Sequence, residues 1–287
     1  MPNLSRRKFL YTGAAAVVGA AVLGADGFVE SNHPHLVEIE IPLARLPESF
    51  DGFRLVQLSD FHYEDHYSAV PIRQSIAIVN SLRPDLTVLT GDFVTVPLFD
   101  RALSVREVVA SCEPCASILS GIVGPNYAIL GNHDAASYPG RIIHALDQAK
   151  IPVLRNQSVP LECGRDRIWL AGIDDLLRGM PDMSATLSGV PENEATILLA
   201  HEPDFADDVS LTSVDLQLSG HSHGGQIWIP GIGAPWLPPM ARHYPRGLNK
   251  IGNLTLYTNI GIGTIRAPIR INCRPEVTLI TLRARKS

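Results

Sequence analysis

Five short polar clusters occur in order along the chain, and each one follows an apolar segment that has the pattern of a strand. The clusters are Asp60-Phe61-His62, Gly91-Asp92, Gly131-Asn132-His133-Asp134, His201-Glu202 and Gly220-His221-Ser222-His223. The segments before them are short, rich in leucine and β-branched residues, and bounded by Gly, Pro or Asp, as buried strands are. In an open α/β sheet the strand ends face one crevice, so residues far apart in the sequence can converge there. The pattern therefore predicts an α/β fold with one polar site at the strand ends.

The strand and helix patterns alternate through the first half of the chain. We expect strands at residues 53–58, 86–90, 127–130, 196–200 and 216–218, and helices at residues 72–82, 103–119 and 141–149. Residues 153–171 and 254–282 have the pattern of successive short strands separated by Gly, Asn and Pro. This order predicts a mixed sheet, or two packed sheets, flanked by helices.

The composition fits one catalytic domain. A chain of 287 residues with 45% hydrophobic residues can bury one sizeable core. We expect that domain to span residues 31–287, behind a leader at residues 1–30. The net charge of -5, without a lysine- or arginine-rich stripe away from the chain ends, predicts no nucleic-acid partner.

The leader has the features of a twin-arginine export signal. Ser5-Arg6-Arg7-Lys8-Phe9-Leu10 precedes an Ala- and Gly-rich apolar run that ends near Ala25 and is short for a membrane span. We therefore expect the twin-arginine export machinery as a partner, and a location in the periplasm or on the outer face of the cytoplasmic membrane. An ordinary signal or a single anchoring helix is the alternative. The leader has no clean small-x-small cleavage site, so it is either removed or kept. A leader that is kept would associate the protein with the membrane.

The four cysteines carry less information. Cys112 and Cys115 form a C-x-x-C inside the predicted helix that holds Pro114, while Cys163 and Cys273 stand alone in predicted strands. A zinc ribbon requires a second close pair, which the sequence lacks. We expect these cysteines to be buried small apolar residues, and a disulfide formed on export is the alternative.

Three of the clusters carry metal-ligand types at metal-ligand spacing. Asp60 and His62 offer a carboxylate and an imidazole two residues apart, a donor set that suits Mn, Fe or Zn better than calcium. Asp92 is a natural bridging carboxylate for two ions about 3.5–4 Å apart. His221 and His223 place two imidazoles between flexible glycines, which is a strong metal-ligand pattern.

The other two clusters suggest a ligand and an acid. Asn132 can ligate a metal without adding charge, whereas His133 cannot easily reach the same ion. His133 is therefore a candidate proton donor to a leaving group, and Asp134 a candidate to hold its ring in the required tautomer. His201 follows an apolar run, where a lone histidine is more often structural than a ligand.

The order of the motifs resembles the calcineurin-like metallophosphoesterases from about residue 53 to the C-terminus. The amino-acid sequence of residues 198–204 and 218–226 is similar to that of the YkuE/YaeI-type bacterial phosphodiesterase branch. The resemblance implies a four-layer α/β/β/α sandwich with two mixed central β-sheets. It also implies two metal sites and an acid: Asp60, His62 and His223 on one metal, Asn132, His201 and His221 on the other, Asp92 bridging them, and His133 as the general acid.

The same resemblance implies a phosphodiester hydrolase that uses two divalent metal ions, Mn, Fe or Zn. Hydroxide bound by the ions would attack phosphorus, and His133 would protonate the leaving group. Thr95 stands where purple acid phosphatases have a tyrosine ligand, and the Asp-Arg pair of protein phosphatases is absent from residues 95–97. These departures disfavour both of those branches.

The segment from Gln226 to Tyr257 is rich in aromatic residues and proline, and it directly follows the last ligand pair. We expect it to form a wall of the site, with four candidate substrate contacts: Trp236, Arg242, Tyr244 and Arg246. Such a wall suits an amphipathic phosphodiester of a lipid, an envelope component or a wall polymer, although ordinary loop packing is an alternative. A pyrophosphatase of a nucleotide-sugar lipid intermediate and a non-catalytic interaction module are the other functions considered.

Overall fold

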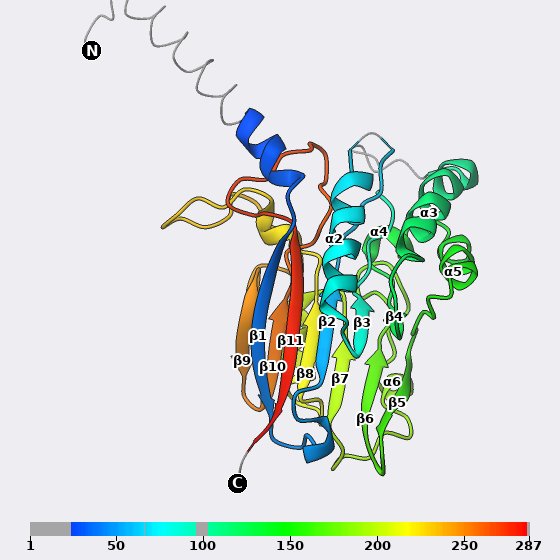
Figure 1. Ribbon diagram of the computed structural model, residues 1–287, viewed down its shortest axis with the longest axis vertical. Helices are drawn as coiled ribbons and strands as arrows, with labels where there is room; N and C mark the ends of the chain where they lie inside the picture. Colours follow the sequence, from blue (N-terminus) through cyan, green and yellow to red (C-terminus); the bar gives the residue numbers. More distant parts are fainter. Residues whose placement is uncertain (1–23, 66, 96–102, 286–287) are drawn as a thin grey trace, which may run out of the picture.

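The computed structural model describes residues 24–65, 67–95 and 103–285, and it contains two mixed β-sheets (Figure 1). The first sheet has the order β1-β11-β2-β3-β4. Strands β2, β3 and β4 are parallel, β11 is antiparallel to β2, and β1 is parallel to β11. The strand bounds are β1 His35–Leu43, β2 Arg54–Leu58, β3 Leu86–Leu89, β4 Asn126–Ala128 and β11 Glu276–Ala284.

The second sheet has the order β5-β6-β7-β8-β10-β9. Its four central strands run parallel, and each edge strand pairs antiparallel with its neighbour. The bounds are β5 Gln157–Cys163, β6 Asp166–Gly172, β7 Thr196–Leu199, β8 Leu216–Ser219, β9 Gly247–Ile251 and β10 Leu254–Thr258. Mixed sheets of this kind confirm the predicted fold class.

One hydrophobic core lies between the two sheets. It draws side chains from both of them, including Leu55, Val88, Leu170, Leu199, Leu218 and Ile280. All four residues of β3, β7 and β8 are buried, because one face of each strand meets the other sheet and the opposite face meets a helix or loop layer. This two-sided burial explains why the strands are continuous apolar runs in the sequence.

The two outer layers differ in thickness. Helices α2 (Ala69–Leu82), α3 (Val105–Leu119) and α5 (Pro139–Gln148) cover the first sheet. The start of α3 is fixed by a capping box, in which the Ser104 hydroxyl accepts from the Glu107 amide and the Glu107 carboxylate accepts from the Ser104 amide. The second sheet is covered by shorter elements: α6 (Met183–Thr186), η2 (Pro203–Phe205) and α7 (Ala206–Val209).

The predicted elements occur with small shifts at their ends, but three segments differ from expectation. Residues 254–282 contain only β10 and β11, and the connection between them is irregular. Strands β1 and β9 were not predicted. The three remaining short elements are η1 (Glu48–Phe50), α4 (Asn132–Ala135) and η3 (His223–Gly225), and the last two begin at predicted site residues.

The four thiols are free. Cys112 and Cys115 are buried in α3, and burial raises the pKa of both. Cys273 is buried as expected but lies outside the strands, whereas Cys163 is exposed at the end of β5, so its predicted burial is wrong.

The twin-arginine motif and residues up to 23 lie outside the described residues. Residues 24–31 form a helix that hydrogen-bonds to the connection between β10 and β11, through the Arg270 amide and the Gly27 carbonyl. Among the residues described, no helix combines the length and the apolar character needed to cross a membrane.

Candidate metal centre

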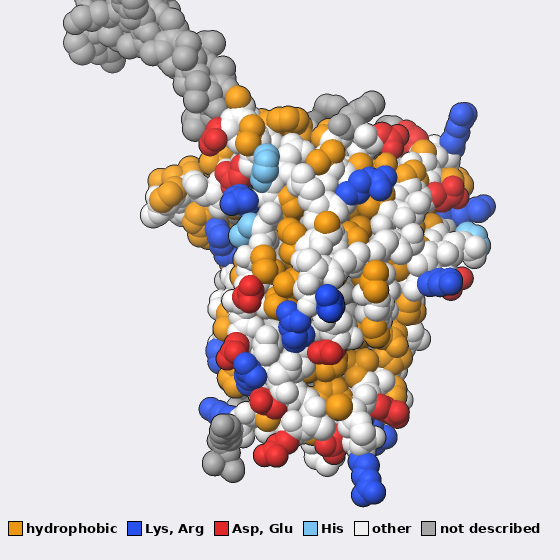
Figure 2. Space-filling model, in the orientation of Figure 1, with side chains coloured by type: hydrophobic (Ala, Val, Ile, Leu, Met, Phe, Trp, Pro, Cys, Tyr) orange, Lys and Arg blue, Asp and Glu red, His pale blue; other side chains and the backbone are white. Residues whose placement is uncertain are grey.

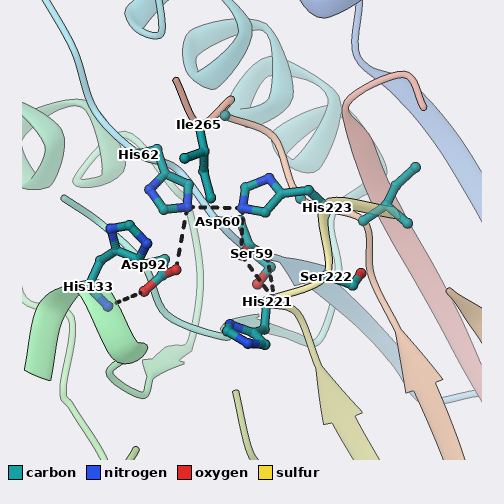
Figure 3. Close-up of polar contacts among 12 residues, drawn as sticks. Ser59, Asp60, His62, Asp92, His133, His221, Ser222, His223 and Ile265 are labelled. Atoms are coloured by element: carbon teal, nitrogen blue, oxygen red, sulfur yellow. Dashed lines mark hydrogen bonds and ion pairs between the residues drawn. The ribbon is translucent and has the colours of Figure 1, made fainter. Parts of the chain in front are cut away.

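The predicted ligands converge at the carboxyl ends of β2, β3, β7 and β8 (Figure 3). The ligand atoms of the predicted ligands form two neighbouring groups, one of Asp60, His62 and His223 and one of Asp92, His201 and His221, and a third group joins His62 and Asp92 to His133. Asp92 Oδ2 lies 3.4 Å from His62 Nε2 and 3.2 Å from His201 Nε2. A single carboxylate oxygen therefore faces both groups, which is the geometry required of a bridging ligand.

The backbone at the site is held in left-handed conformations. Five of the predicted ligands, none of them glycine, have positive φ: Asp60 (53°), His62 (41°), Asp92 (58°), His221 (68°) and His223 (51°). Each such residue costs roughly 1–2 kcal/mol relative to ordinary backbone. Strain of this kind is typical of functional sites whose surroundings hold the residue in place.

Contacts between the loops supply that support. The Asp60 amide donates to the Gly91 carbonyl at 3.0 Å, and the His62 amide donates to the Asp92 carbonyl at 2.9 Å. A Cβ atom at Gly220 would collide with the Ser59 hydroxyl, so this glycine allows the loop after β8 to approach the loop after β2. The His221 amide then reaches the Asp60 carboxylate at 3.0 Å.

Two histidines have their tautomers fixed by backbone carbonyls. His201 Nδ1 lies 2.6 Å from the Thr90 carbonyl and His221 Nε2 lies 2.8 Å from the Pro239 carbonyl. A carbonyl can only accept, so these nitrogens carry hydrogens, and in the neutral ring the opposite nitrogen presents a lone pair. His201 Nε2 then faces Asp92 Oδ2, and two acceptors at 3.2 Å require a cation or a proton between them.

Other polar atoms at the site either face one another or have no hydrogen-bond partner in the described part of the chain. His62 Nε2 and His223 Nε2 lie 3.0 Å apart, and the second is 3.3 Å from Asp60 Oδ1. Asn132 Oδ1 and His62 Nδ1 are buried and accept or donate no hydrogen bond among the described residues. Buried polar groups are almost always paired, so this concentration fits a site built for cations.

The protonation states favour the same interpretation. Burial lowers the pKa of His221 to about 4 and, with His62 and Arg270 beside the ring, lowers that of His223 as well. Burial by itself would raise the pKa of Asp92, but His201 and His133 outweigh it and hold that pKa well below its ordinary value. Burial by itself would lower the pKa of His201, but Asp92 outweighs it and raises that pKa well above its ordinary value, so without a cation a proton lies between His201 and Asp92. Neutral imidazoles and an ionised carboxylate are the forms that bind metals, so a bound cation would displace this proton.

His133 and Asp134 differ in their surroundings. The His133 amide donates to Asp92 Oδ1 at 2.9 Å, and its half-buried ring lies 4.7 Å from the His62 ring between centroids. Asp134 accepts four backbone amides, from Asp92, Phe93, Val94 and Gly131, at 2.7–3.2 Å. These bonds fix the loop that carries Asp92, and the role of Asp134 in holding the His133 ring stays a prediction.

An open cavity of about 640 Å³ leads to the centre, and the predicted wall forms only part of it. Trp236 lines the cavity, but the other three predicted contacts lie outside its lining. Tyr244 donates to Asp207 at 2.7 Å, and the Arg242 amide is bound to Asp204. Arg246 stacks on Trp228.

The arginines at the cavity mouth are Arg178 and Arg266, which the sequence did not single out. Arg178 comes from the segment after β6 and Arg266 from the irregular connection after β10. Neither lies in a recognisable motif, so only the folded chain places them beside the ligands. The residues next to Arg178 (Gly and Met) and next to Arg266 (Ile and Ala) do not indicate substrate binding.

The calcineurin-like phosphoesterase family model matches residues 53–225, which contain every candidate ligand. The chain belongs to this family. Among its calcineurin-like relatives, the metallophosphoesterase YkuE of Bacillus subtilis is 36% identical over 99% of both chains. The phosphodiesterase YaeI of Escherichia coli is 32% identical over 97% of this chain and 99% of its own length. The UDP-2,3-diacylglucosamine pyrophosphatase LpxG of Chlamydia muridarum is 26% identical over 95% of this chain and 98% of its own.

Family and geometry agree on the broad chemistry. This calcineurin-like protein is a phosphoester hydrolase, and its His and Asp clusters suit a dinuclear metal site. The resemblance to the YkuE/YaeI branch is confirmed.

Proposed function

We propose that the protein hydrolyses a phosphodiester of the cell envelope, carried by a lipid or a wall polymer, with two divalent metal ions and with His133 as general acid. The observation that carries this proposal is the position of Asp92 Oδ2 between two ligand groups, 3.4 Å from His62 Nε2 and 3.2 Å from His201 Nε2. The open cavity gives a phosphate access to the same place.

The side chains divide into two sets around that carboxylate. Asp60, His62 and His223 would hold one ion, and Asn132, His201 and His221 the other. When bound, the two metal ions supply positive charge at the phosphate and lower the pKa of a bound water to about 7. The mixed nitrogen and oxygen donors favour Mn, Fe or Zn.

His133 is placed to donate a proton to the leaving group. Its ring lies at the cavity lining beside Asp92, and burial lowers its pKa to about 4, so the resting imidazole is neutral near pH 7. An anionic phosphodiester in the cavity favours the protonated ring. The ring can then give that proton to the oxygen that leaves phosphorus, which alkyl leaving groups need most.

The cavity mouth supports an amphipathic substrate. Leu177, Trp236 and Ile265 give it apolar surface, while Arg178 and Arg266 offer guanidinium groups for anionic oxygens. This pairing suits a phosphate attached to a lipid or another apolar group. Action outside the cytoplasmic membrane, after twin-arginine export, completes the proposal and is supported by the Arg6-Arg7 motif.

A pyrophosphatase of a nucleotide-sugar lipid is the second candidate. The two arginines at the mouth favour it, because a second phosphate of such a substrate could bind them while the first binds the ions. The similarity to LpxG points in the same direction. A non-catalytic module is disfavoured, because every position that the family pattern assigns to a ligand or acid is filled by the expected residue type.

A hydrolysis panel separates the candidates. Purified protein, loaded in turn with Mn, Zn, Fe or Mg, is assayed on bis-nitrophenyl phosphate, nitrophenyl phosphate, a phospholipid and a nucleotide-sugar. We expect preference for diesters over the monoester and the highest rate with Mn. A dominant rate on the nucleotide-sugar would support the pyrophosphatase, and preference for the monoester would contradict both candidates.

A further inference from the structure

Large hydrophobic side chains are exposed on a loop that projects beside the cavity. This projecting loop, residues 226–239, carries Ile229, Ile232 and Trp236, whose exposed fractions are 39%, 78% and 56%. Figures 1 and 2 show it extending from the body on the upper left, with hydrophobic side chains over its surface. Exposed apolar patches of this kind usually mark an interaction surface.

The projecting loop has a defined conformation. Ile229 and Gly233 form a bridge across the turn, with the Gly233 amide 2.8 Å from the Ile229 carbonyl. At its base the Trp228 amide donates to the Ile271 carbonyl at 2.9 Å. The apolar tip is therefore held away from the body by backbone pairing, although folding inward would bury it.

The helix at residues 24–31 joins the same surface. Glu30 accepts from the amides of Asn272 and Cys273, next to the residue that pairs with the projecting loop. Its exposed face carries Phe28 and Val29, which are 47% and 54% exposed. In Figure 1 the helix and the projecting loop extend from the same end of the molecule.

Cationic groups surround this apolar surface. Arg246 stacks on Trp228 at 4.7 Å and Arg266 on Trp236 at 5.4 Å, measured to the ring centroids. A groove of about 580 Å³ between helix and loop region is lined by Arg246 and Arg274, with two histidines and two acidic residues: His33, His35, Asp26 and Glu30. The Glu30 carboxylate accepts from two backbone amides and keeps its charge, so Asp26 and Glu30 balance the two arginines of the groove, while Arg266 adds a further cation beside Trp236.

We propose that the projecting loop and the helix at residues 24–31 dock on the surface of a lipid bilayer that contains anionic phospholipids. Aliphatic tips with tryptophan and arginine behind them are the arrangement that lies at the boundary of headgroups and acyl chains. The chain supplies a second reason, because the sequence before this helix is an apolar run from Phe9 to Leu23 behind Arg6, Arg7 and Lys8. Residue 24, which directly follows that run in the sequence, begins the helix of the proposed docking surface.

Docking would also orient the catalytic cavity. Trp236 and Arg266 belong both to the docking surface and to the cavity mouth. A docked molecule therefore opens its cavity toward the lipid surface. The docking itself does not depend on hydrolysis, so it can be tested separately from the proposed function.

The test uses the full chain and vesicles of phosphatidylcholine with 30% phosphatidylglycerol, chosen as about a third anionic lipid. Some of the phosphatidylcholine carries brominated acyl chains, which quench a tryptophan that reaches them. The variant Ile229→Ser/Ile232→Ser removes the apolar tip, and Leu211→Ser, at a residue 86% exposed at the opposite end of β8, is the matched control. Hydrolysis of soluble bis-nitrophenyl phosphate reports whether the Ile229→Ser/Ile232→Ser and Leu211→Ser variants are folded.

We expect quenching for the native chain and for Leu211→Ser, and vesicle binding about 30- to 100-fold weaker for the double variant, given the apolar area removed. Trp236→Phe should remove most of the quenching. Arg246→Gln/Arg274→Gln should reduce the preference for anionic vesicles by about fivefold per charge.

Two outcomes would overturn the proposal. One is equal quenching in the native chain and the double variant, since the leader alone would then account for binding. The other is a dimer in sedimentation velocity that the double variant abolishes, since a second copy of the chain would then occupy the surface.

Discussion

The two ends of the sheets contain the same kinds of charged residue but treat them differently. At the end opposite the metal centre, carboxylates meet arginines: Asp215 binds Arg45 at 2.7 Å, and Glu194 binds Arg167 at 2.7 Å. At the carboxyl ends of the strands, Asp92 Oδ2 faces His201 Nε2, while the Nδ1 hydrogen of that ring is directed to the Thr90 carbonyl. One end satisfies its charges within the chain, and the other leaves acceptors facing one another.

This difference separates stability from function. A paired surface charge is complete without a ligand and contributes little, whereas buried acceptors that face one another are stable only when something positive lies between them. The backbone follows the same division, since Asp60, His62, Asp92, His221 and His223 all adopt strained left-handed conformations. Substitutions at the two ends should therefore fail in different ways.

The largest effect should come from Asp92→Asn. Loss of the shared charge should remove the bound metals and lower the hydrolysis rate by about 10³-fold or more. Metal content is measured by elemental analysis and the rate on bis-nitrophenyl phosphate. Asp215→Asn, at the opposite end, is the control and should keep both. An Asp92→Asn protein that retains two metals and its activity would contradict the bridging role.

Next in size is His133→Ala. The loss should be about 10²- to 10⁴-fold on an alkyl phosphodiester, because that leaving group requires a proton. It should be much smaller on a nitrophenyl ester, whose leaving group is stable as an anion. Rates on both substrates are compared at equal metal content. Equal losses would show that His133 does not act as the acid.

Asp134→Asn should damage the fold more than the proton transfer. Four backbone amides point at this carboxylate, and an Asn side chain would turn an NH₂ group toward some of them. The expected cost is roughly 2–3 kcal/mol in the free energy of unfolding, measured by urea titration. At a temperature where the variant is folded, the ratio of alkyl to nitrophenyl rates should match that of the native protein. A changed ratio would support the role suggested by the sequence, in which Asp134 holds the His133 ring in the required tautomer.

At the cavity mouth, Arg178→Gln/Arg266→Gln should raise KM by about tenfold on an anionic amphipathic substrate, with a smaller change in kcat. Arg242→Gln removes an exposed arginine that lies outside the cavity and is the matched control. Steady-state kinetics on both variants provide the measurement. Equal KM values for the two would remove the arginines from substrate binding.

The metal centre could be predicted from the sequence because its ligands directly follow strands that occur as apolar runs. The residues at the cavity mouth could not be predicted, since Arg178 and Arg266 reach it from loops whose paths depend on tertiary contacts. Strand β1 has an alternating pattern at Val37, Ile39 and Ile41, but its partner β11 lies at the other end of the chain. The four amides that Asp134 accepts could not be predicted, because backbone amide directions follow from the turn at Asp92 and residue types do not reveal them.

The smallest effect should come from Glu194→Gln, at the end of the sheets that satisfies its own charges. Arg167, with help from Trp169, lowers the pKa of Glu194 below its ordinary value of 4.5. A carboxylate with a lowered folded-state pKa stabilises the protein above the unfolded pKa, and this contribution disappears as the pH falls through the folded value. Urea midpoints of the native protein and the variant should therefore differ slightly at pH 6 and converge in acid. Because the pair is exposed and already complete, hydrolysis at pH 7 should not change. A changed hydrolysis rate would show that the two ends are coupled, which would break the division drawn between them.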